Sequence, residues 1–216
     1  MTLFLQATMQ GLALGAVYSL VAIGLVLIYK ATDVLSFAQP ALAVAGAGII
    51  SALAVDRGIS FWIALPLGIF ITGVLGLIIE RTFLRAMVGE PVFSVAILTI
   101  GIDILIRTVL DNWIGLNPRY MGDSFSQMGN FGSLNIGGVA IQFLELTALL
   151  SAIAVIALLS VFFKFSKYGL AMRATSFDQE ASLAQGINVG RVIALVWFIA
   201  AMLASLSGFF ITGGFN

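Results

Sequence analysis

Residues 4–29 read FLQATMQGLALGAVYSLVAIGLVLIY, an apolar run that contains no charged side chain. A helix needs roughly 20 mostly apolar residues to cross the hydrocarbon core of a bilayer. The run is longer than the hydrophobic region of a secretory signal peptide, and no Lys or Arg precedes it, as a signal peptide would require. It therefore predicts a retained membrane-spanning helix.

Five further apolar stretches follow along the chain. They run from Phe37 to Val55, Phe61 to Ile79, Val92 to Ile114, Phe143 to Phe163 and Val192 to Thr212. The 216 residues are 61% hydrophobic and only 9% charged, with a mean hydropathy of +1.12, which leaves little chain for a water-soluble module. The sequence predicts an all-α, polytopic membrane helix bundle of about six spans, in a single transmembrane domain over residues 1–216.

Composition excludes several classes of function. The formal net charge is zero, so no nucleic acid partner is implied. Without Cys or His, the chain has no disulfide framework, thiol nucleophile, imidazole base or usual zinc ligand set. No Gly-Lys-Ser or Gly-Lys-Thr is present to form a phosphate loop. We expect a protein that is not an enzyme, with no catalytic residues, bound metal or cofactor.

Lys and Arg are distributed unevenly between the connections. The odd-numbered connections carry seven of them, whereas the even-numbered ones carry only Arg57 and Arg119. Short basic loops stay in the cytoplasm, so the N-terminus is predicted outside and the segment 164–191 inside. The Gly-rich segment 115–142 is then an outside loop that could meet a substrate-binding protein. Because the last span would end just before Asn216 with no tail, the chain is expected to be a C-terminally truncated protein.

The cytoplasmic segment 164–191 reads KFSKYGLAMRATSFDQEASLAQGINVGR. Ser176 followed by Gln179 matches a capping box, and acidic residues in the first turn favour the helix dipole. Gly186 fits a left-handed helix stop. The segment predicts a short, exposed helix from Ser176 to Gln185. One interpretation is a docking surface for another protein; the other is an interfacial helix that only tethers two spans.

The same segment carries a family resemblance. Glu180-Ala181-Ser182, three residues and then Gly186 resemble the EAA---G coupling segment of ABC transporter permeases, with Ser182 in place of the second Ala. A narrower similarity, to the permeases of branched-chain amino acid import systems, is carried by Gly169, Arg173-Ala174, Ala181 and Gly186-Ile187-Asn188. Further matches to that family are GAVYSLVAIG at 15–24, SFAQP at 36–40 with Ser and Pro in place of Asn and Gly, Glu80-Arg81 with Arg85, and TIG at 99–101.

The resemblance implies a mechanism and a set of partners. It identifies a permease subunit of an ABC importer in a bacterial-type inner membrane, which moves branched-chain or related amino acids with energy from ATP hydrolysed by a partner. The implied partners are cytoplasmic ATP-binding subunits, a second homologous permease and an extracytoplasmic substrate-binding protein. The implied ATPase-coupling residues are Arg173, Asp178, Glu180, Ala181 and Gly186. Family members continue through further spans beyond the part matched here.

Charged residues also occur inside the fourth span. Asp103, Arg107 and Asp111 recur every four residues, so their side chains lie along one helical face. A charge near the bilayer centre costs on the order of 2.5 to 3.5 kcal/mol and usually faces a bundle interior or a wet cavity. Asp103 and Arg107 could line a path for a zwitterionic substrate, or the three residues could form a self-neutralising structural ladder. The sequence leaves both interpretations open.

Two further features concern helix starts and helix packing. Ser36, Gln39 and Pro40 interrupt the start of the second span, where a broken helix could expose backbone groups to a substrate. An ordinary entry turn is the alternative, since Pro is well tolerated in a first helical turn. Gly11 and Gly15, continued by Ser19, form a small-residue stripe that predicts helix packing.

The sequence is also compatible with other functions. Within the same family, urea, short amides or other small polar solutes are the nearest alternative substrates, because the matching motifs concern the scaffold and the coupling segment. An ion-coupled secondary transporter would use Asp103 and Arg107 as its relay pair. A purely structural membrane scaffold would carry no solute.

Overall fold

The computed structural model describes residues 2–87, 90–114, 133–136 and 139–214. Within these residues, six helices are long and apolar enough to cross a membrane, as predicted. They are formed by α1 (Thr2–Thr32), α2 (Gln39–Ser51) with the π-helical turn Ala52–Asp56, α3 (Phe61–Ile79) with the turns Glu80–Leu84 and Arg85–Met87, α4 (Val92–Ile114), α6 (Phe143–Phe165) and α9 (Val189–Gly214).

The third span is longer than the sequence indicated. The third span was predicted to end at Ile79, but the helix continues through a π-helical turn and a 3₁₀ turn to Met87. No Gly or Pro occurs in residues 80–87 to stop the helix. Glu80, Arg81 and Arg85 therefore lie on helical backbone rather than in a loop.

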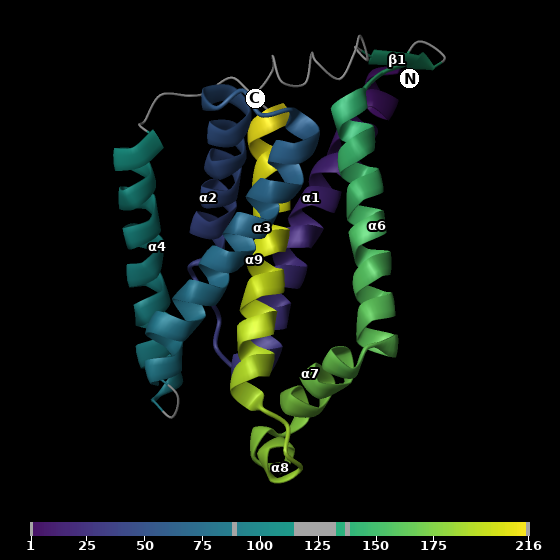
Figure 1. Ribbon diagram of the computed structural model, residues 1–216. Coiled ribbons are helices and arrows are strands. Elements are labelled where there is room, and N and C mark those ends of the chain that lie inside the picture. Colours follow the sequence, from purple (N-terminus) through teal and green to yellow (C-terminus); the bar gives the residue numbers. More distant parts are fainter. Residues whose placement is uncertain (1, 88–89, 115–132, 137–138, 215–216) are drawn as a thin grey trace.

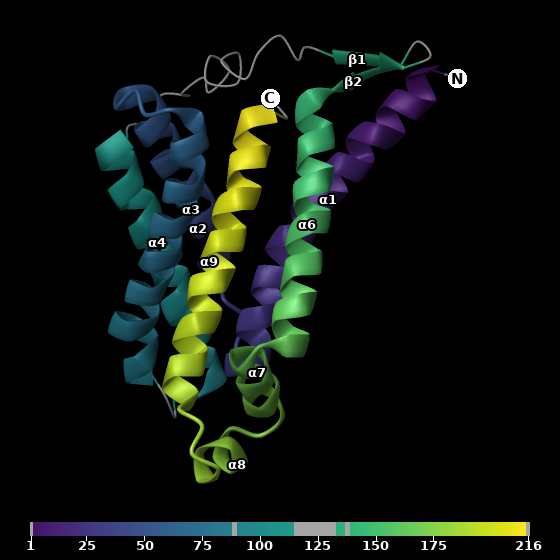
Figure 2. The same cartoon turned by 45° about the vertical axis from the view of Figure 1, so that its right-hand side comes forward.

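Helix α9 lies at the centre of the bundle. It packs against α1, α2 and α3 and is the most buried of the six described spans. Both views place α4 on one side of α9 and α6 on the other (Figures 1 and 2). The main hydrophobic core follows the same arrangement, with Trp197, Ala200, Ala201 and Ala204 of α9 fully buried.

Small residues let α2 approach α9 closely. A side chain on Gly46 would overlap Ser205, and a side chain on Gly208 would overlap the backbone of Ala43. Glycine at these positions allows the backbones to come close enough for continuous van der Waals contact.

The small-residue stripe of α1 behaves differently. No described atom lies within 4 Å of a Cβ built on Gly11 or Gly15, and both residues are exposed. The stripe therefore makes no close helix contact within the described part of the chain, and its role in helix packing stays a prediction. The close contact on α1 occurs instead at Gly24, where a side chain would meet Gln39 and Ala200.

Two short strands add a small β element to the predicted all-α bundle. Strand β1 (Ser133–Ile136) pairs antiparallel with β2 (Val139–Gln142), with Ser133 opposite Gln142. The rest of the predicted outside loop, residues 115–132 and 137–138, lies outside the described residues. At the opposite end of the bundle lie two short helices, α7 (Lys167–Phe177) and α8 (Gln179–Ala184) (Figure 1).

Candidate functional site

The connection between the last two spans folds as two helices rather than one. Ser176 was predicted to cap the short helix, but it lies in the last turn of α7 and donates a hydrogen bond to the Arg173 carbonyl oxygen. Helix α8 begins three residues later, at Gln179. The capping box is therefore wrong, because α7 extends far enough to include the serine.

Asp178 is the residue that caps α8. It adopts an extended backbone conformation, and its carboxylate accepts a hydrogen bond from the Ala181 amide at 2.9 Å. An acidic N-cap both satisfies a free amide and complements the helix dipole. Because the backbone of Asp178 is extended, α8 does not continue α7 as one helix.

Gly186 ends α8 as predicted. Its φ of +81° lies in the left-handed region, which an L-residue with a side chain rarely adopts. The Gly186 amide donates a hydrogen bond to the Leu183 carbonyl oxygen, and the Ile187 amide donates one to the Ser182 carbonyl oxygen. These two hydrogen bonds define a Schellman motif. The chain then leaves towards α9 in a fixed direction.

Each of the predicted coupling residues is exposed. Exposed side chains or backbone are found at Arg173, Asp178, Glu180, Ala181 and Gly186. Ser182 is buried and faces the rest of the protein. Two apolar side chains that the sequence analysis overlooked also lie here, Phe177 at 92% exposure and Leu183 at 58%. Their exposure could be found only from the structure, since apolar residues occur throughout this sequence.

Gln179 connects α8 to the first span. Its side-chain Nε2 donates a hydrogen bond to the carbonyl oxygen of Ala31 at 3.1 Å. Ala31 is one residue before the end of α1, where a helical carbonyl has no partner within the helix. The contact fixes the start of α8 against the end of α1.

A cavity of about 170 Å³ adjoins this contact. Gln179, Thr32 and Val34 line it together with Glu80 and Arg85 of the turns that follow α3. Glu80 is only 3% exposed. Glu80 and Arg85 of the family motif thus line the same cavity as the first residue of α8.

After α1 the chain turns back into the bundle. Asp33 has a φ of +55°, a left-handed conformation that Asp tolerates better than most residues, and it ends the helix. Residues 33–38 are not α-helical, and α2 starts at Gln39. Because the Gln39 side chain contacts Ala200, in the middle of α9, the second span begins well inside the bundle (Figure 1).

This re-entrant segment, defined as residues 33–39, contributes two of the predicted pathway residues. Gln39 is fully buried, and its Nε2 donates to the Ala200 carbonyl oxygen at 3.0 Å. Ser36 is 2% exposed, and its hydroxyl has no partner among the described residues. The Phe37 amide donates to Thr99 Oγ1 of α4 at 3.1 Å. Polar groups therefore gather at the start of α2.

Asp103 and Arg107 pair with each other, as the spacing predicted. Arg107 Nε lies 2.8 Å from Asp103 Oδ2, and the side chains are 45% and 21% exposed respectively. Asp103 lies one helical turn beyond Thr99, which holds the re-entrant segment. No described hydrogen bond joins the pair to Ser36 or Gln39. The structure thus places the four predicted pathway residues in two neighbouring groups.

Comparison with known proteins gives a consistent result. The sequence model of the family described as "Branched-chain amino acid transport system / permease component" matches residues 7–216. The high-affinity branched-chain amino acid transport system permease protein LivH of Salmonella typhimurium is 27% identical over 213 residues, covering 95% of this chain and 69% of LivH.

Other similar proteins carry related descriptions. LivH of Escherichia coli strain K12 is 27% identical, over 95% of this chain and 69% of its own length. The permease protein BraD of Pseudomonas aeruginosa is 26% identical, over 94% of this chain and 69% of BraD. The comparison with solved structures found no match.

Proposed function

Since this chain belongs to the branched-chain amino acid transport permease family, we propose that it works as a membrane subunit of an ABC importer. Energy would come from ATP hydrolysed by partner subunits that dock on the end of the bundle formed by α7 and α8. The chain would move branched-chain or related amino acids and would not itself catalyse a reaction.

The exposed helix α8 is the observation that carries this proposal. It is a short helix with a defined start at Asp178, a defined stop at Gly186 and an outward face of Glu180, Ala181 and Leu183. Exposed apolar side chains beside charged ones are typical of a protein interface. Together with Arg173 at the edge, this surface would fit a groove in an ATPase subunit.

The contacts of α8 suggest how ATPase motion would reach the membrane. A push on α8 would act on Ala31 through Gln179, and so on the end of α1. The re-entrant segment follows directly and is held by Thr99 and by the Gln39 contact with Ala200. Rigid-body movement of α8 would therefore change the contacts of a polar segment inside the bundle.

We place the substrate path at this polar segment. Ser36 and Gln39 would offer hydrogen-bonding groups to the solute, because the Ser36 hydroxyl and the Gln39 Oε1 are buried without described partners. Asp103 and Arg107 would border the path on the α4 side, with charges that suit the ammonium and carboxylate of an amino acid. Urea, short amides or other small polar solutes are the alternative cargo, and this path would also admit them.

The same proposal specifies surroundings and orientation. The protein would lie in a bacterial-type inner membrane with its N-terminus outside and α8 in the cytoplasm, as the excess of Lys and Arg at the α8 end favours. A second homologous permease would complete the path, and an extracytoplasmic binding protein would deliver the solute.

Docking of the ATPase can be tested with matched variants. Leu183→Ser alters α8, whereas Ile63→Ser removes a side chain of equal type and similar exposure, 59% against 58%, at the other end of the bundle. Mild detergent extraction followed by mass spectrometry should recover an ATPase subunit with the wild type and Ile63→Ser. Recovery should fall strongly for Leu183→Ser. Equal recovery for all three chains, or recovery of the permease alone in every case, would refute the proposal.

A further inference from the structure

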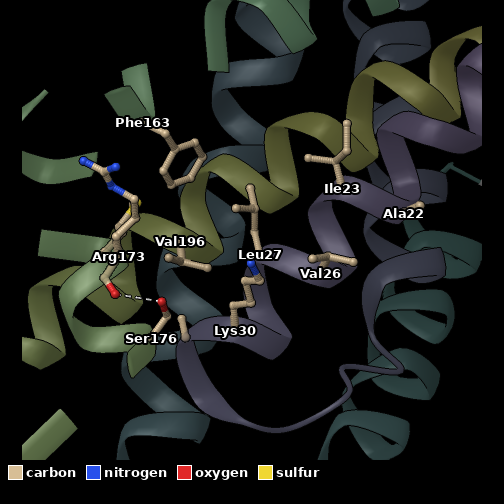
Figure 3. A pocket seen from close by; sticks show the side chains of 11 residues that line it. Ala22, Ile23, Val26, Leu27, Lys30, Phe163, Arg173, Ser176 and Val196 are labelled. Carbon is tan, nitrogen blue, oxygen red and sulfur yellow. Dashed lines mark hydrogen bonds between the residues drawn. The ribbon is translucent and has the colours of Figure 1, made fainter. Parts of the chain in front are cut away.

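A groove beside α1 combines apolar walls with two cations. It has a volume of about 430 Å³ and lies between α1, the end of α6, α7 and α9. Figure 3 shows Arg173 and Phe163 on one side and Lys30, Leu27 and Val26 on the other. None of the described residues that line the groove is acidic.

The two cations have no protein partner among the described residues. Neither the Lys30 ammonium nor the Arg173 guanidinium makes an ion pair or a side-chain hydrogen bond there. Ser176, which also lines the groove, uses its hydroxyl on the Arg173 carbonyl oxygen. The groove therefore carries two positive charges that no described ion pair neutralises.

The polar and apolar parts of the groove are ordered along the membrane axis. Lys30 lies in the last turn of α1, at the end of the span, and Arg173 lies on α7, beyond the end of α6. The apolar wall continues along α1 to Ala22, which is eight residues before Lys30 and so about 12 Å deeper at 1.5 Å per residue. A phospholipid has the matching arrangement, with a charged head group at the membrane surface and hydrocarbon chains below it.

We propose that this groove binds an anionic phospholipid of the cytoplasmic leaflet, with its phosphate between Lys30 and Arg173 and an acyl chain along Ala22, Val26 and Leu27. Basic pockets between membrane helices on the cytoplasmic side are suited to acidic head groups. A zwitterionic lipid also has a phosphate, but its ammonium would add a third positive charge to a groove that already holds Lys30 and Arg173. The inference rests on the proposed orientation, in which α7 and α8 face the cytoplasm.

Retention of defined lipids tests the site. The full chain would be exchanged into micelles with equal amounts of phosphatidylglycerol and phosphatidylcholine of identical acyl chains, and retained lipids would be counted by native mass spectrometry. Since each basic side chain near an anionic surface strengthens binding roughly fivefold, we expect K30Q/R173Q to lower phosphatidylglycerol retention by more than tenfold. Phosphatidylcholine retention should change little.

Two further variants keep the result interpretable. K167Q/R191Q removes the same charge from exposed positions outside the groove and should retain phosphatidylglycerol as the wild type does. The Ala22→Trp variant keeps both cations, but its larger side chain would occupy the space beside the apolar wall. We therefore expect this variant not to retain the lipid. Equal retention of both lipids by the wild type, or equal loss in K167Q/R191Q, would overturn the proposal. Recovery of the ATPase with the wild type and with Ala22→Trp, which leaves Arg173 and α8 unaltered, reports separately on the proposed function.

Discussion

The side-chain amide of Gln179 donates a hydrogen bond to the carbonyl oxygen of Ala31, which joins the first residue of α8 to the end of α1. The two residues are far apart in the sequence, and one lies on the exposed short helix while the other belongs to a span. Beyond Ala31 the chain turns at Asp33 into the re-entrant segment. This hydrogen bond thus lies between the candidate docking surface and the candidate substrate path.

Gln179→Ala should weaken coupling more than it weakens binding of the ATPase. The substitution removes the hydrogen bond to Ala31 while it leaves the exposed face of α8 intact, and a bond of this kind contributes about 1 kcal/mol. We expect ATPase recovery near the wild-type level with a several-fold lower ratio of solute transported to ATP hydrolysed. Gln185→Ala, an exposed glutamine at the end of α8, serves as control and should keep the ratio. A ratio unchanged in Gln179→Ala would argue against transmission through α1.

Gly186→Ala should destabilise the protein through its backbone alone. Gly186 has a φ of +81°, and no described atom lies within 4 Å of an added Cβ, so the cost is conformational rather than steric. A side chain in the left-handed region costs roughly 1 kcal/mol. Thermal unfolding in detergent should show a lower midpoint for Gly186→Ala and a smaller decrease for Gly186→Asn. Gly15→Ala, in an open helical position, should not lower the midpoint.

Gly46→Ala should separate α2 from α9. An added Cβ would overlap the Cα and side chain of Ser205, and a backbone atom cannot move aside without moving its helix. Overpacking of this kind costs about 1 to 3 kcal/mol. The amount of folded protein in size-exclusion chromatography should fall, whereas Gly11→Ala should behave as the wild type because its position is open. Equal yields from both variants would contradict the close α2–α9 contact.

Asp103 and Arg107 should show coupling in a double-mutant cycle. Either single substitution, Asp103→Asn or Arg107→Gln, removes one member of the ion pair and leaves the other beside apolar side chains, whereas the double variant removes both. We expect the double variant to unfold at a higher temperature than the less stable single variant, with a coupling energy of about 1 kcal/mol. Strictly additive effects would mean that the 2.8 Å ion pair contributes nothing in the membrane.

Several features could be predicted from the sequence because they depend on local properties. The apolar runs predicted the six described spans to within three residues at their helix ends, apart from the extension of α3 past Ile79. The spacing of Asp103 and Arg107 predicted their ion pair. Gly186 predicted the left-handed stop of α8, since the preference of glycine for positive φ is a property of the residue itself.

Other features were decided by tertiary structure. The sequence predicted a helix cap at Ser176, but α7 extends past this serine and α8 is capped by Asp178 instead. Gly11 belonged to the stripe that predicted helix packing, yet of Gly11 and Gly46 it is Gly46 that closely approaches another helix in the described structure. No local pattern indicated that Gln179 would reach Ala31 or that the second span would begin near the middle of α9.

The difference between the features that the sequence predicted and those that tertiary structure decided has a physical cause. Transfer of a side chain into a bilayer is favourable or unfavourable residue by residue, so hydropathy along the chain determines which segments span the membrane. Inside the membrane the lipid tails are as apolar as the helices, so hydropathy does not select which faces meet. Close packing and a few buried hydrogen bonds make that selection, and they join residues whose proximity exists only in the folded bundle.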